Sequence, residues 1–185
     1  MTVRVEDQGE GLLFLYLAAA SQGEVVESIL RVCRDESTRV LALFGLETLV
    51  APTPYVSTFE RFEHLQQTLL AVVEGDLTNA GSDLALCCDL VVVGTAASLT
   101  SAEVKCCLDQ GPLGTQYQWS SSPELTLPER VPADQLLHLG VAIRLSSSPK
   151  EDAMALGSRL AFLIRDFHRS IRQTYSSSWR YRPKL

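Results

Sequence analysis

The most informative segment of this 185-residue chain is Gly75–Asp89, which reads Gly-Asp-Leu-Thr-Asn-Ala-Gly-Ser-Asp-Leu-Ala-Leu-Cys-Cys-Asp. It places the small residues Ala80 and Gly81 just ahead of the apolar stretch Leu84–Val93. Small residues at that point predict a tight turn at a helix start, with backbone N–H groups that point outward and can hold an oxyanion. The stretch Leu84–Val93 is either a buried strand or a helix that leads into one, and periodicity alone does not distinguish the two.

The amino-terminal segments alternate between strand and helix patterns. Val3–Val5 and Leu12–Leu17 flank a glycine-rich turn and predict a hairpin. Gln22–Arg34 carries apolar residues at helical spacing, and Thr38–Phe44 is an apolar run typical of a buried strand. Phe59–Val73 again has a helical pattern. A strand, helix, strand order favours parallel pairing, so the sequence predicts an α/β fold.

Composition narrows the class of protein. Hydrophobic residues make up 46% of the chain and charged residues 21%, which is enough apolar material for one globular domain. The longest apolar runs are too short or too interrupted to span a bilayer, and the first residues lack the basic region of a secretion signal. We therefore expect a cytoplasmic protein that does not enter a membrane. No Cys-x-x-Cys motif occurs and no histidine has a partner at ligand spacing, so no metal site is predicted.

Charge is divided unevenly along the chain. Residues 1–100 hold 5 basic against 14 acidic side chains, whereas residues 101–185 hold 11 against 8. The basic surplus lies in the last helix, predicted over about Pro149–Thr174, and in the tail that follows it. An amphipathic helix with exposed arginines explains this run better than nucleic-acid binding does. We expect a core over residues 1–145 and, in the same domain, a carboxy-terminal helix and basic tail over residues 146–185.

Two carboxylates stand near glycine-bearing segments. Asp83 follows the small residues Ala80 and Gly81, and Glu103 comes 20 residues later, ahead of a second loop that contains Gly111 and Gly114. Carboxylates supplied by separate elements beside an anion-binding turn are typical of an acid/base site. Both groups can then flank a bound water or a substrate α-carbon.

The same residues resemble the crotonase (enoyl-CoA hydratase/isomerase) superfamily. The family pattern Gly-x-Ala-x-Gly-Gly-Gly-x-Glu-Leu-Ala-x-x-Cys-Asp fits Gly75–Asp89 without a gap. The resemblance implies that Ala80 supplies one N–H of an oxyanion hole, and that Asp83 and Glu103 take the places of the two catalytic glutamates. Looser matches lie in Gly111, Gly114, Thr115, Gln116, Val131-Pro132-Ala133 and Leu139-Gly140-Val141. The implied fold is the α/β, crotonase-like ββα superhelix (spiral), truncated at its carboxy-terminal helical region.

The second oxyanion donor belongs to a loop that differs from the family. An ungapped register places Pro52 at the donor position, and proline has no N–H to give. A shift of one residue offers the N–H of Ala51 or of Thr53 instead. The resemblance implies a substrate pocket lined by Tyr55, Gly81, Gly111 and Gly114.

Such a site implies chemistry on an acyl thioester, because two N–H donors stabilise the enolate that forms at its carbonyl. We expect hydration, dehydration or double-bond isomerisation of an acyl group on CoA or on a carrier protein, in fatty-acid or polyketide metabolism, with no further cofactor. The family's basic, nucleotide-facing segment is replaced by Ala18–Glu24, which has no Lys or Arg. The alternative is a catalytically degenerate homologue that serves as a non-catalytic subunit or binding partner of a larger enzyme. The resemblance also implies a homo-oligomer, a trimer or a dimer of trimers, with residues 146–185 as a candidate oligomerisation element.

Overall fold

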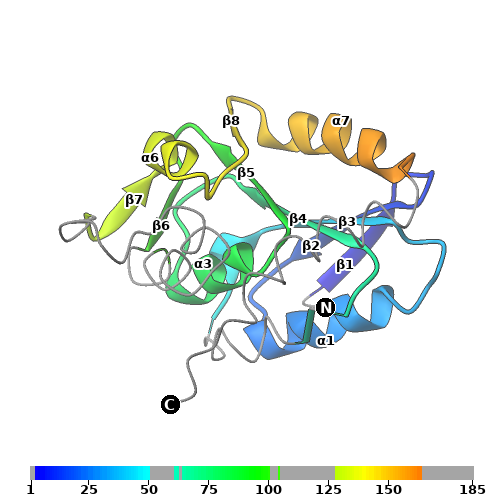
Figure 1. Ribbon diagram of the computed structural model, residues 1–185. Coiled ribbons are helices and arrows are strands. Elements are labelled where there is room, and N and C mark those ends of the chain that lie inside the picture. The colour runs from blue at the N-terminus through cyan, green and yellow to red at the C-terminus, as the bar shows by residue number, and fades with distance from the viewer. Residues whose placement is uncertain (1–2, 51–60, 63, 101–103, 105–127, 164–185) are drawn as a thin grey trace, which may run out of the picture.

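The computed structural model describes residues 3–50, 61–62, 64–100, 104 and 128–163. A six-stranded sheet of order β1-β2-β3-β4-β5-β8 forms its centre, and a small second sheet pairs β6 with β7 (Figure 1). The strands are β1 (Val3–Asp7), β2 (Leu12–Leu17), β3 (Val40–Phe44), β4 (Thr68–Val73), β5 (Leu90–Gly94), β6 (Ser98–Thr100), β7 (Arg130–Pro132) and β8 (Arg144–Ser146). The helices are α1 (Gln22–Val32), the 3-10 turn η1 (Leu46–Thr48), α3 (Asn79–Leu86), α6 (Ala133–His138) and α7 (Pro149–Ala161).

β1 and β2 form the antiparallel hairpin that the sequence predicts. The turn between them holds Gly9, Glu10 and Gly11 at φ values of 85°, 54° and 82°, a region that glycine enters without steric cost. The other neighbouring strands of the large sheet pair in parallel. The predicted α/β class is therefore confirmed.

Helices cover both faces of the large sheet, with α7 on one face and α1 and α3 on the other (Figure 1). The side chains of β3 pack against the helices on both faces of the sheet. Val40, Ala42 and Phe44 belong to the apolar cluster that includes residues of α7, and Leu41 and Leu43 belong to the cluster that includes α1 and α3. Strands that are buried on both faces appear in a sequence as continuous apolar runs rather than as alternating patterns.

β4 shows that the helix predicted over Phe59–Val73 is wrong in its second half. Thr68–Val73 is a strand between β3 and β5, and all of its residues are buried. A short run that is apolar throughout satisfies helical spacing as well as it satisfies a doubly buried strand, so periodicity misassigned it. The ambiguous stretch Leu84–Val93 is resolved into the end of α3 followed by β5.

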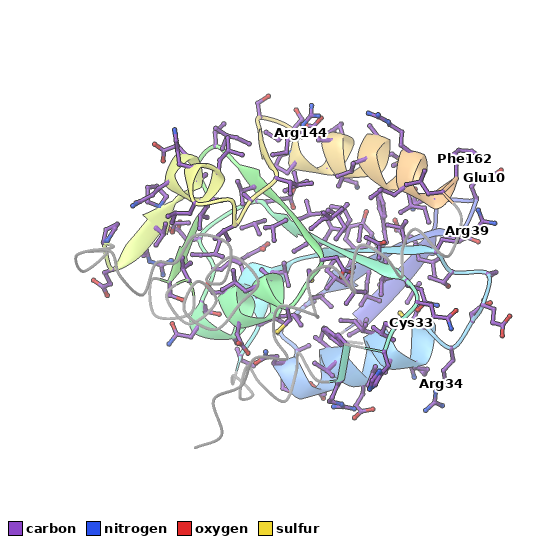
Figure 2. The ribbon with its side chains drawn as sticks, viewed as in Figure 1. Glu10, Cys33, Arg34, Arg39, Arg144 and Phe162 are labelled. Atoms are coloured by element: carbon purple, nitrogen blue, oxygen red, sulfur yellow. The ribbon has the colours of Figure 1, made fainter. Side chains whose placement is uncertain are left out.

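α7 begins at Pro149 as expected and ends at Ala161, so the predicted helix does not continue unbroken beyond that residue. Arg39 Nη1 donates a hydrogen bond of 2.7 Å to the Ala161 oxygen, one of the last-turn carbonyls that lack a donor within the helix. Figure 2 shows Arg39 and Phe162 at this end of α7, and the Phe162 side chain is 67% exposed. Residues 164–185, with the rest of the predicted helix and the tail, lie outside the described residues.

The division placed between residues 145 and 146 falls inside β8, which pairs with β5. β8 leads directly into α7, and Arg144 forms an ion pair of 2.7 Å with Asp152 of that helix. Ala153 and Leu160 of α7 share an apolar cluster with strands β2 to β5. The first part of the segment 146–185 thus packs on the same sheet as the core before it.

Candidate functional site

Three connections meet at the carboxyl edge of the large sheet. The chain after β3 contacts the chain after β2, because the Val50 N–H donates to the Ala20 oxygen over 3.1 Å. The chain after β4 joins them, because Thr78 Oγ1 donates to the Leu49 oxygen over 3.2 Å. Ligand sites of open α/β sheets form outside the carboxyl ends of the strands. The segment predicted to supply the second oxyanion donor starts from this edge.

α3 begins at the same edge with the predicted oxyanion turn. Its N-cap is Thr78, whose Oγ1 accepts the Gly81 N–H over 3.4 Å. Ala80 lies in the first turn and is 2% exposed. First-turn N–H groups have no acceptor within the helix, and the helix dipole adds positive partial charge there. The predicted helix start at Ala80 and Gly81 is confirmed, and the use of the Ala80 N–H as an oxyanion donor stays a prediction.

Gly81 lets the start of α3 approach η1. A Cβ on Gly81 would lie 2.4 Å from the carbonyl oxygen of Leu46 and 3.2 Å from its carbonyl carbon. Gly45, just before η1, has a φ of 78°, and a Cβ there would lie 2.4 Å from the Leu17 oxygen. The two glycines thus bring the ends of β2 and β3 and the start of α3 into direct backbone contact. The Leu46 carbonyl fills the space that a side chain at position 81 would need.

Asp83 follows on α3 and is 3% exposed. Its Oδ2 accepts a hydrogen bond of 2.5 Å from Nε2 of Gln22, the fully buried first residue of α1. This bond joins the starts of α1 and α3 inside the protein. Gln22 was not predicted as a site residue, although its helical spacing with Val25 and Ile29 places it on the buried face of α1. An inward-facing glutamine at a helix start was the signal that could have found it.

The segment that carries Glu103 starts beside α3. The Thr100 N–H donates to Ser82 Oγ over 3.1 Å, and Ser82 directly precedes Asp83. Of the predicted site residues, α3 brings together Ala80, Gly81 and Asp83. The others lie outside the described residues: Ala51, Thr53, Tyr55, Glu103, Gly111 and Gly114.

Arg130 of β7 is a second residue that the sequence analysis missed. Its Nη1 donates to the Leu77 oxygen over 3.1 Å and to Ser98 Oγ over 3.4 Å. Ser98 Oγ in turn donates to Asp76 Oδ1 over 2.6 Å. These bonds fix the connection between β4 and α3 just ahead of the N-cap. No local pattern could reveal this contact, since Arg130 and Leu77 are 53 residues apart.

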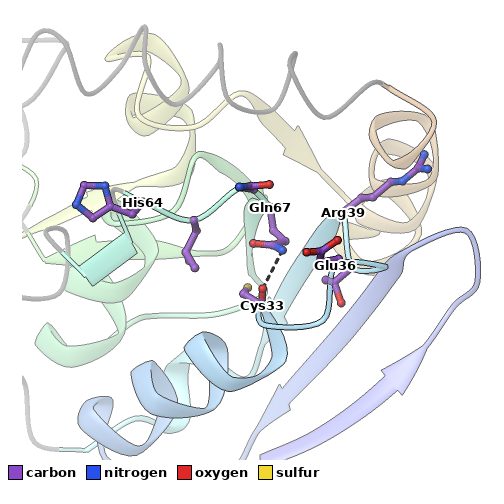
Figure 3. A pocket seen from close by; sticks show the side chains of 8 residues that line it. Cys33, Glu36, Arg39, His64 and Gln67 are labelled. Carbon is purple, nitrogen blue, oxygen red and sulfur yellow. Dashed lines mark hydrogen bonds between the residues drawn. The ribbon is translucent and has the colours of Figure 1, made fainter.

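A pocket of about 210 Å³ opens at the opposite, amino edge of the strands (Figure 3). Gln67 Nε2 donates to the Cys33 oxygen over 2.9 Å beside it. The pocket is lined by Cys33, Glu36, Thr38, Arg39, His64, Leu65, Gln66 and Gln67. None of these residues belongs to the predicted site, so this pocket and the start of α3 are separate places in the fold.

Among the described residues, no group of three or more His, Cys, Asp or Glu side chains could hold a metal ion. No helix in those ranges is long and apolar enough to cross a membrane.

Neither a protein-family model nor a curated protein matches the sequence. The structure is nevertheless similar to many solved structures. An enoyl-CoA hydratase subunit from Geobacillus kaustophilus is 21% identical, with a TM-score of 0.72 over 98% of this chain and 84% of that chain. A monofunctional enoyl-CoA isomerase from M. smegmatis is 18% identical, with a TM-score of 0.73 over 93% of this chain and 90% of that chain. ThnE from S. clavuligerus is 15% identical, with a TM-score of 0.69 over 96% of this chain and 95% of that chain.

These likenesses define the fold. The chain has the fold of the crotonase (enoyl-CoA hydratase/isomerase) superfamily, an α/β structure with a mainly parallel sheet. The resemblance drawn from Gly75–Asp89 is therefore confirmed for the fold, and α3 is the helix that this segment forms.

Proposed function

We propose that this protein acts on an acyl thioester and stabilises the enolate that forms at the thioester carbonyl. The observation that carries the proposal is the buried start of α3, where Ala80 and Asp83 lie three residues apart in a crotonase fold. One backbone donor aimed at a developing oxyanion typically contributes about 3 kcal/mol to transition-state stabilisation. A carboxylate within reach of the same substrate adds proton transfer.

In the hydration direction, water adds to the β-carbon of an enoyl thioester while one carboxylate takes a proton from that water. The electron pair of the C=C bond moves toward the carbonyl oxygen, and the Ala80 N–H and the N–H of Ala51 or Thr53 stabilise the resulting enolate. The other carboxylate then delivers a proton to the α-carbon. Asp83 and Glu103 are the proposed pair. Dehydration is the reverse, and isomerisation moves a proton between the α- and γ-carbons without water.

The thioester arrives on CoA or on the phosphopantetheine of a carrier protein. Ala18–Glu24, which follows β2 at the site edge, has no Lys or Arg to attract nucleotide phosphates. CoA and a carrier protein present the same pantetheine arm and the same reacting carbonyl, so one site can serve both. The neighbours named above as an enoyl-CoA hydratase subunit and an enoyl-CoA isomerase favour including CoA esters in the assay.

Wild-type protein is expected to consume an enoyl thioester. The assay follows the loss of the conjugated enoyl absorbance with crotonyl-CoA and, separately, with a crotonyl-carrier protein. We expect turnover above the uncatalysed rate with at least one of them, because oxyanion stabilisation and acid/base transfer act on the part that both share. If the protein neither turned over nor bound either thioester, that result would favour the alternative, a non-catalytic subunit. The comparisons do not support that alternative.

The assembly and setting of the protein are further parts of the proposal. We expect a homo-oligomer, a trimer or a dimer of trimers, to which residues 146–185 contribute. Light scattering on the full chain measures this directly. The cytoplasmic location and the place in fatty-acid or polyketide metabolism stay predictions from the sequence.

A further inference from the structure

We propose that Gln22 is a positioning residue that holds Asp83 in place as the proton acceptor of the reaction, an inference that rests on the proposed function. Gln22 Nε2 lies 2.5 Å from Asp83 Oδ2. Gln22 is fully buried and Asp83 is 3% exposed, so the bond forms away from bulk solvent. The side-chain amide nitrogen can only donate, and the oxygen that it faces must accept. The hydrogen bond therefore fixes the orientation of the Asp83 carboxyl group inside the protein.

The backbone around Gln22 is fixed from both sides. Ser21 is the N-cap of α1, and its N–H and hydroxyl donate to Glu24 Oε2 over 2.9 Å and 3.0 Å. These two bonds hold the pKa of the Glu24 carboxyl below its ordinary value. On the preceding side, the Ala20 oxygen accepts the Val50 N–H. Gln22 therefore projects from a capped helix start rather than from a loose loop.

The backbone around Asp83 is equally constrained. Gly81 packs against the Leu46 carbonyl, and Ser82 Oγ accepts the Thr100 N–H. A functional carboxylate that is held by rigid elements and a dedicated partner keeps the geometry that proton transfer requires. A displacement of about 1 Å can lower the rate of such a step by about 100-fold.

With Asp83 as the proton acceptor, Glu103 is the proton donor of the proposed pair. When water adds to the enoyl β-carbon, Asp83 takes the water proton and becomes neutral. Glu103 gives its proton to the α-carbon and becomes ionised. The two groups then return to their starting states by exchange with solvent, so one water is consumed and no other reactant is needed.

The test compares two buried glutamines of the same chain. Gln22→Met removes the amide donor and keeps the length of the side chain. Gln67→Met is the matched control, because Gln67 is 7% exposed and its Nε2 donates to the Cys33 oxygen at the far end of α1, away from the site (Figure 3). We expect Gln22→Met to lower kcat for a crotonyl thioester by about 10- to 100-fold, with KM little changed. Gln67→Met should keep the wild-type kcat even if its Tm falls.

Gln22→Asn is the second variant, for use if Gln22→Met does not fold. It keeps the donor but shortens the arm, and adding Asp83→Glu lengthens the partner by the same methylene. The double variant Gln22→Asn with Asp83→Glu should have a higher kcat than Gln22→Asn alone. The Asp83→Glu single variant serves as the reference for the effect of the longer carboxylate side chain. A wild-type kcat in Gln22→Met, an equal loss in Gln67→Met, or no recovery in the double variant would overturn the positioning role. Absence of turnover by the wild type would instead overturn the proposed function itself.

Discussion

Asp83→Asn is expected to lower kcat for the preferred enoyl thioester by about 10²- to 10⁴-fold, the usual contribution of a positioned acid or base. Asparagine keeps the size of aspartate and still offers Gln22 an oxygen acceptor, but it cannot take up a proton. Rate measurements with saturating thioester, together with thermal unfolding, separate this loss from a loss of fold. Glu103→Gln should have an effect of the same order, because the two carboxylates act in one sequence of proton transfers.

Asp89→Asn is the control for this pair. Asp89 Oδ2 accepts the Leu69 N–H over 2.7 Å at the turn between α3 and β5, a structural bond that asparagine can still make. We expect its kcat to stay within about twofold of the wild type, in line with a carboxylate that takes no part in proton transfer. Undiminished turnover in both Asp83→Asn and Glu103→Gln would contradict the assigned site.

Gly81→Ala is expected to damage both the stability of the fold and the activity of the site. The new Cβ would lie 2.4 Å from the Leu46 oxygen, so α3 or η1 must move. Overpacking of this kind typically costs about 1–3 kcal/mol of unfolding free energy. The same shift displaces the Ala80 N–H, and we expect kcat to fall by about 100-fold. Urea unfolding and the enoyl absorbance assay measure the two effects on one preparation.

Gly23→Ala is the matched control for Gly81→Ala. Gly23 lies in the first turn of α1, and a Cβ there would meet no atom within 4 Å. Alanine has the higher helix propensity, so this variant should gain up to about 1 kcal/mol and keep its turnover. If Gly81→Ala were as stable and as active as Gly23→Ala, the close approach of α3 and η1 would have no role in the fold or the site.

Gly75–Asp89 shows what the sequence could predict. The small residues at 80 and 81 predicted a helix start, and α3 begins at Asn79. The hairpin, the first helix and the strand after it were also predictable, since glycine turns and apolar spacing are local signals. The fold followed because one gapless motif tied these local elements to a known arrangement.

The parts that the sequence could not reveal depend on contacts between distant residues. The hydrogen bond from Gln22 to Asp83 spans 61 positions, and the approach of Gly81 to Leu46 depends on how η1 turns after β3. β4 was misassigned because burial on both faces removes the alternation that marks a strand. A pattern can place a carboxylate on a helix, but only the packed structure shows which donor holds it.

Stabilisation of a thioester enolate can be measured without turnover. An acetoacetyl thioester forms a conjugated enolate that absorbs at longer wavelength than its keto form, and an oxyanion hole shifts this equilibrium toward the enolate. Titrating the acetoacetyl esters of CoA and of a carrier protein with wild-type protein should produce a saturable enolate band with at least one of them. The band should weaken strongly in Gly81→Ala and persist in Gly23→Ala. If neither ester gave an enolate band at protein concentrations that fully bind the ester, the protein would have no oxyanion hole for a thioester enolate.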